Sequence, residues 1–146
     1  MKKFMLLLIV LVSASMLGAC SWFQEADQSL KYADQAKEHI QTLSDFAEQA
    51  PQMIQDAATD PETKKQLENR LNELKKDIEQ FNLINAPTIA KDIHAQLVEK
   101  NKILLQEINQ AVDNGHLALD RLQNSPILAT ISDITGLINR IENLGL

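Results

Sequence analysis

The side chains best suited to nucleophilic or metal chemistry are a single cysteine, Cys20, and three histidines, His39, His94 and His116. A thiolate can act as a nucleophile or bind zinc, and an imidazole can act as a general base or a metal ligand. The histidines lie far apart in the sequence, and none belongs to a His-Glu-x-x-His, Glu-x-x-His or Cys-x-x-Cys pattern. The sequence therefore predicts no metal site and no cofactor.

Other catalytic patterns are also missing from the sequence. Asp92 and His94 are the best candidate for a carboxylate–histidine pair, but residues two apart on a helix point to different sides. We therefore expect every histidine at the surface or at the rim of the core. The glycines that follow Cys20 stand alone, so nucleophile elbows and phosphate-binding glycine loops are absent. The carboxylates between Glu62 and Glu79 are interleaved with basic residues, as on a solvated helix face. These patterns predict that the protein is not an enzyme.

The position of Cys20 is more informative than its reactivity. Lys2 and Lys3 precede nine consecutive apolar residues, Phe4 to Val12, and small residues then lead to the cysteine. This order is typical of a secretory signal peptide. A transmembrane anchor is the alternative, but the apolar run is shorter than the about 20 residues that span a bilayer. The pattern favours a cleaved signal.

The sequence Leu17-Gly18-Ala19-Cys20 resembles the lipobox of bacterial lipoproteins. The resemblance implies that a diacylglyceryl group is attached to the cysteine sulfur and that the precursor is cut between Ala19 and Cys20. We therefore expect residues 1–19 to be a removed signal peptide, residues 20–23 a lipid-bearing anchor segment, and residues 24–146 one domain. The protein would be anchored by lipid in the cell membrane, facing outside the cytoplasm. A free buried cysteine is the alternative.

The charge of the mature chain restricts its partners. Without residues 1–19 the chain has 12 Lys and Arg and 20 Asp and Glu, a formal charge of −8. Such a surface repels phosphate backbones and anionic headgroups, which argues against nucleic-acid binding and against a basic second membrane contact. The lipid on Cys20 would have to anchor the protein. Trp22 and Phe23 could lie at headgroup level or pack against the first helix.

Apolar residues recur at steps of three and four along the mature chain, which predicts an all-α fold. The expected architecture is an antiparallel bundle of about four amphipathic helices over residues 24–58, 61–84, 87–113 and 126–144. Asp60-Pro61 and Ser125-Pro126 are typical helix starts. Pro51 falls within the first helix without changing the apolar phase, so we expect a kink there. Residues 116–124 form a connector with a short helical turn.

The last and third predicted helices contain the candidate binding residues. A stripe of isoleucines on the last helix is broad enough to need two neighbours or a partner; it comprises Ile127, Ile131, Ile134, Ile138 and Ile141. Gly136 in the middle of this helix suggests a close helix approach. Asn101 occupies a position in the third helix where the apolar spacing predicts an apolar residue. It could fix the register between helices or contact a ligand inside the bundle. Candidate binding residues are Asn101, Leu137, Ile138 and Ile141.

The lipobox and three further segments, "DFAEQAP", "APTIAKDIH" and "ISDITGLINRIENLGL", together resemble a group of small lipoproteins of Gram-positive, bacillus-like bacteria. The resemblance covers most of the chain and implies a location on the outer face of the cytoplasmic membrane. That group has no established activity or ligand, so no functional residues are carried over.

Two functions fit these observations. The first is a non-enzymatic, lipid-anchored helical module that binds another envelope component, with a protein as the expected partner. The alternative is a receptor that holds a small apolar or amphipathic molecule within the bundle. An aspartate at Ile138 separates the two roles of the isoleucine stripe, and we expect the stripe to be core, so that the variant is largely unfolded.

Overall fold

The computed structural model describes the backbone of residues 19–113 and 116–143, and side chains within residues 26–112 and 116–143. The elements in chain order are α2 (Ala19–Ala57), α3 (Pro61–Asn82), the 3-10 turn η1 (Thr88–Ala90), α4 (Lys91–Ala111), β1 (Val112–Asp113), β2 (His116–Leu117), α5 (Leu119–Gln123), α6 (Ile127–Thr135) and α7 (Ile138–Glu142). The predicted all-α class is confirmed. The predicted signal peptide, apart from Ala19, lies outside the described residues.

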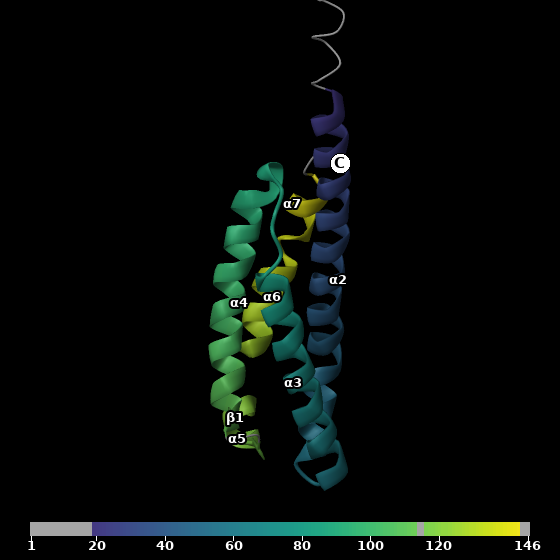
Figure 1. Cartoon of the computed structure of the whole chain (residues 1–146). Coiled ribbons are helices and arrows are strands. Elements are labelled where there is room, and N and C mark those ends of the chain that lie inside the picture. The colour runs from purple at the N-terminus through teal and green to yellow at the C-terminus, as the bar shows by residue number, and fades with distance from the viewer. Residues whose placement is uncertain (1–18, 114–115, 144–146) are drawn as a thin grey trace, which may run out of the picture.

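The long helices form an elongated antiparallel bundle (Figure 1). Figure 1 shows α2 and α4 running in one direction, and α3 and α6 returning in the other. α2 contacts α3, α5, α6, α7 and η1, and α4 contacts α3, α5, α6, η1 and β1. α2 is the longest described helix, and both it and α4 contact most of the other described elements. Within the described residues, no helix is both long enough and apolar enough to cross a membrane.

The boundary between α2 and α3 follows the predicted capping pattern. The carboxylate of Asp60 accepts hydrogen bonds from the backbone N–H groups of Glu62 and Thr63, at 3.1 and 3.2 Å. The Thr63 hydroxyl also donates to it, at 2.6 Å, and this bond contributes most to a lowered pKa of the Asp60 carboxyl. Pro61 occupies the first helical position, where its missing N–H costs nothing.

The first helix differs from the prediction at its beginning. It starts at Ala19, five residues earlier than the predicted residue 24, so the lipobox cysteine already lies within the helix. It continues through Pro51 to Ala57, as the uninterrupted apolar phase predicts. The helix therefore links the predicted lipid attachment to the far end of the bundle.

The predicted third helix is shorter than residues 87–113 and is followed by an unpredicted hairpin. It begins with the 3-10 turn η1 and ends at Ala111. β1 and β2 then pair antiparallel, with Val112 opposite Leu117. Pairs only two residues long carry too little alternation to be recognised in a sequence. The predicted helical turn in the connector is confirmed as α5.

The prediction of one continuous last helix over residues 126–144 is wrong, because the chain forms α6 and then α7. Gly136 ends α6, and its N–H donates to the carbonyl oxygen of Ser132 at 3.0 Å. A Cβ at Gly136 would meet only the carbonyl oxygens of Ser132 and Asp133, both at 3.5 Å, an ordinary contact. The close helix approach expected at this glycine is therefore also wrong. Low helix propensity at Gly136 instead favours a break here.

The isoleucine stripe forms part of the core in spite of this break. Ile131, Ile134 and Ile141 are fully buried, and Ile127 is nearly so. Ile138 and Leu137 are half-buried and pack against the same core. Four of the five isoleucines of the stripe are therefore buried, and the half-buried Ile138 packs at the edge of the core.

Candidate functional site

The polar residue predicted in the third helix lies at the centre of a buried network. Asn101, on α4, has no exposed surface. Its Nδ2 donates to Asn82 Oδ1 at 2.9 Å and lies 3.1 Å from His39 Nε2. His39 Nδ1 in turn lies 2.6 Å from Asp77 Oδ2. This set of four side chains, here called the His39 network, joins α2, α3 and α4.

The expectation that every histidine lies at the surface or rim is wrong for His39, which is 2% exposed. Its ring stacks on that of Phe81, with centroids 4.2 Å apart and planes 9° from parallel. His39 falls three residues after Ala36 and four before Leu43, both of which are buried. That spacing places it on the core face of α2, and it is the signal that sequence reasoning overlooked.

The hydrogen bonds of the His39 network account for both ring nitrogens. Nδ1–H donates to the Asp77 carboxylate, and Nε2 accepts from the amide of Asn101, whose second N–H goes to Asn82. This assignment follows from the partners, since carboxylates accept and amide nitrogens donate. Neither ring nitrogen is left to accept a proton from a substrate.

The other two histidines lie where the sequence predicts. His94 is half-buried, and Tyr32 Oη lies 3.3 Å from its Nδ1. Burial lowers the pKa of His94, and burial raises the pKa of Tyr32 to about 12. The neutral forms of both groups are therefore favoured near pH 7, with the tyrosine hydroxyl donating. His116 is exposed.

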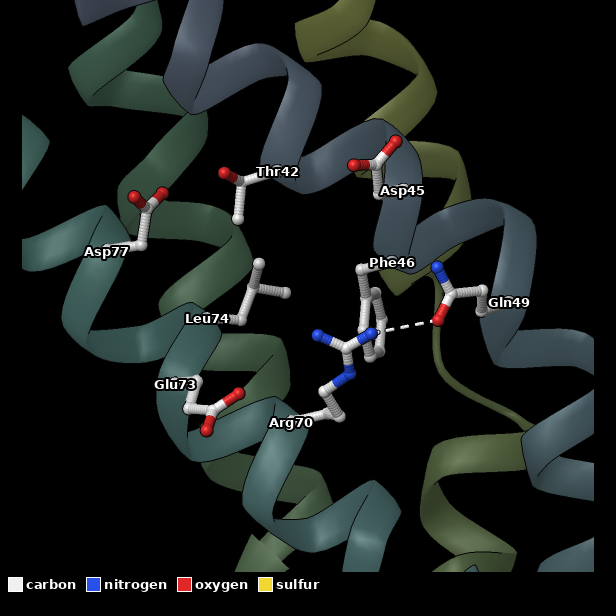
Figure 2. Close-up of a pocket in the computed structure, with 8 residues that line it drawn as sticks. All are labelled: Thr42, Asp45, Phe46, Gln49, Arg70, Glu73, Leu74 and Asp77. Atoms are coloured by element: carbon white, nitrogen blue, oxygen red, sulfur yellow. Dashed lines mark hydrogen bonds between the residues drawn. The ribbon is translucent and has the colours of Figure 1, made fainter.

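Two neighbouring surface hollows lie between α2 and α3, and they share Asp77 in their lining. The larger has a volume of about 360 Å³ and has Phe46 and Leu74 at its base (Figure 2). The smaller, of about 240 Å³, is lined by His39, Phe81 and Ile84 among others. We call the two hollows together the α2–α3 groove.

Carboxylates dominate the charged lining of the α2–α3 groove. Acidic side chains come from both helices, and the larger hollow has one basic residue, Arg70; the acidic ones are Glu38, Asp45, Glu73 and Asp77. Arg70 Nη2 donates to Gln49 Oε1 across the groove at 2.9 Å, as Figure 2 shows. The lining has a formal charge of −3 when His39 is neutral. Sequence reasoning read the α3 acids only as a solvated face, because it could not place α2 opposite them.

The residues predicted for binding separate into two environments. Asn101 belongs to the His39 network, whereas Leu137, Ile138 and Ile141 take part in apolar packing of the core. Cys20 is the second residue of α2, and its side chain lies outside the described part. Among the described residues, no three His, Cys, Asp or Glu side chains are grouped so as to hold a metal ion.

Comparisons with known proteins agree with the resemblance seen in the sequence. The model of a family of unknown function, DUF6376, matches residues 32–144. The chain is also similar to the uncharacterized lipoprotein YybP of Bacillus subtilis (strain 168), with 28% identity over 145 residues, covering 96% of this chain and 98% of the relative. No solved structure matches the chain. The expected resemblance to small lipoproteins of bacillus-like bacteria is confirmed.

Proposed function

The chain belongs to the DUF6376 family, and from this premise we propose that it is a lipid-anchored, non-enzymatic module that binds another component of the cell envelope. The similarity to a lipoprotein extends over nearly the whole chain. It supports the predicted signal peptide, the lipid on Cys20 and a position outside the cytoplasm at the membrane. The domain from residue 24 onward then carries the binding surface.

The α2–α3 groove is the surface that we assign to the partner, and it is the observation that carries this proposal. The larger hollow lies at the low end of the about 300–1,000 Å³ typical of ligand sites. Its apolar base is almost fully buried, with Phe46 at 7% and Leu74 at 3% exposure, so it offers little apolar area to a ligand. Charged side chains supply most of the recognition chemistry. A protein segment with basic side chains complements a lining of charge −3.

The absence of catalysis is a proposal that rests on the His39 network. His39 with Asp77 is the arrangement in the described chain that most resembles a general base with its orienting carboxylate. Both ring nitrogens are engaged by protein groups and the ring is 2% exposed. A substrate could reach neither nitrogen without breaking the contact between three helices.

The receptor alternative depends on two features, the broad isoleucine stripe and Asn101. The stripe packs within the core, and Asn101 is hydrogen-bonded to His39 and Asn82. Both features are therefore explained by contacts within the chain.

Site-specific photo-crosslinking in intact cells tests the assigned surface. A photo-reactive amino acid is placed at Asp45 or Glu73, which are exposed in the groove, and at Gln106, which is exposed on α4, as a matched control. We expect one adduct of defined size from the groove positions and none from Gln106. Glu38→Arg, which places a positive charge on the α2 wall of the same groove, should abolish that adduct, because it weakens charge complementarity with a basic partner. Equal adducts from all three positions, or an adduct from Gln106 alone, would exclude the groove as the binding surface.

A further inference from the structure

α2 connects the predicted lipid attachment to the bundle without a linker. It is a single helix from Ala19 to Ala57, and Cys20 is its second residue. At 1.5 Å per residue, the helix from Cys20 to Ala57 is about 55 Å long. The polypeptide between the anchor and the domain is therefore helical from the first residue of the mature chain.

The first part of α2 extends beyond the other described elements, as Figure 1 shows. Ala26, Asp27 and Gln28 are exposed, and burial against the bundle begins at Ser29 and continues at Tyr32. Cys20 and Ser29 are about 14 Å apart along the helix axis. This segment, residues 20–28, is here called the stem.

The bundle is fixed to the stem because α2 continues as its main structural element. α2 contacts α3, α5, α6, α7 and η1, so the bundle cannot pivot about α2 without breaking core contacts. α2 contains no glycine, and its one proline, Pro51, lies in its last two turns, far from the anchor. A rotation of the stem is therefore a rotation of the whole domain.

The exposed face of α2, at the end of the stem and just beyond it, is unsuited to lying on a membrane. A helix that lies in the interface needs a broad apolar face to bury among the headgroups. Asp27, Gln28, Lys31 and Asp34 are exposed here, with Leu30 as the apolar exception at 52% exposure. The apolar face of α2 is already covered by the bundle. If the helix stands end-on to the bilayer, the polar face of α2 stays in water and its apolar face stays covered by the bundle.

We infer that α2 is a rigid stem that holds the bundle end-on to the membrane and presents the α2–α3 groove at a fixed height. This inference rests on the lipid attachment in the proposed function. Groove residues Thr42 to Gln49 would lie about 33–44 Å along α2 from Cys20. The turn between α2 and α3 would be the end farthest from the bilayer. The partner is then an extracytoplasmic protein segment that reaches this height, rather than the lipid surface.

Energy transfer from a labelled protein to a dye-labelled membrane measures this height. The lipidated protein is purified and placed in vesicles of phosphatidylglycerol and phosphatidylethanolamine that contain an acceptor lipid. Acylation consumes Cys20, the single cysteine of the chain, so Thr59→Cys and Gln28→Cys each provide one labelling site on an exposed residue. We expect the Thr59 label to lie about 45 Å farther from the bilayer than the Gln28 label. Equal transfer from the two labels would overturn the inference, because the bundle would then lie flat.

Insertions after Gln28 test whether the stem sets the height. A flexible insertion of seven Gly and Ser residues should lower and broaden the height of the Thr59 label. A helical insertion of seven residues, about two turns, should raise it by about 10 Å. Heights that change in neither variant would contradict a rigid stem. Absence of fatty acid on Cys20 in the purified protein would instead refute the proposed function, and intact-mass measurement of the same sample distinguishes the two failures.

Discussion

At the residue scale, the His39 network shows how a buried polar group is made compatible with a helical core. The imidazole donates to Asp77, accepts from the amide N–H of Asn101, and stacks on Phe81. Asp77 keeps part of its carboxylate at the groove surface, with the side chain 32% exposed. A matched network specifies one arrangement of α2, α3 and α4, because any slip of one helix leaves a buried group unpaired.

Removing Asn101 should therefore destabilise the fold more than removing an exposed asparagine from the same helix. We expect Asn101→Ala to lower the free energy of unfolding by about 1–3 kcal/mol, because His39 Nε2 and Asn82 Oδ1 lose their donor. Asn109→Ala is the control, since Asn109 is exposed and accepts from Lys75 at 2.7 Å; its effect should stay within about 0.5 kcal/mol. Urea unfolding measures both. Equal effects of the two substitutions would show that the network contributes nothing specific.

The single tyrosine of the chain, Tyr32, provides a direct test of burial next to Phe81, the residue on which His39 stacks. Burial raises the pKa of Tyr32 to about 12, whereas an unfolded tyrosine has a pKa of about 10. The unfolded chain releases this proton first as pH rises, so stability should begin to fall near pH 10 and continue to fall toward pH 12. Absorbance at 295 nm follows the phenolate of Tyr32 alone. A midpoint near pH 10 in the folded protein would mean that the hydroxyl is solvated.

At the element scale, the isoleucine stripe illustrates a limit of periodicity arguments. Spacing alone makes Ile127 to Ile141 one stripe on one helix, yet Gly136 divides it into α6 and α7. The stripe still belongs to the core, because the break between α6 and α7 is short and Ile141 on α7 is fully buried, at 0% exposure. Ile138 instead becomes the first residue of α7 and is half-buried.

This division changes which aspartate substitution should unfold the protein. The sequence singles out Ile138→Asp, whereas the structure favours Ile134→Asp, because Ile134 is fully buried. A carboxylate without a partner at Ile134 should cost several kcal/mol, comparable with the about 5–15 kcal/mol stability of a small domain. We expect Ile134→Asp to lose most helical circular dichroism at 25 °C and Ile138→Asp to keep it with a lower melting temperature. If Ile138→Asp is the more damaging of the two, the placement of α7 is wrong.

At the scale of the whole molecule, the sequence predicts the helical class, the capped start of α3 and the buried position of Asn101. Each of these features can be predicted from neighbouring residues or from the helical spacing of apolar residues. The buried His39 and the α2–α3 groove could not be predicted in the same way. Both require knowing that Asp77 on α3 lies opposite His39 on α2, 38 residues away in sequence. The helix break at Gly136 could not be predicted either, because a glycine within a helical apolar pattern is compatible with a close helix contact or with a helix end.

The lipid on Cys20 is the claim on which the anchor, the location and the end-on orientation all depend. It is tested most directly by growing cells with a radioactive or clickable fatty acid and isolating the protein. We expect the wild-type chain to be labelled and to migrate as the mature form. We expect Cys20→Ala and Cys20→Ser to carry no label and to remain uncut or be cut elsewhere. Label on either variant, or none on the wild type, would show that Cys20 is not the site of lipid attachment.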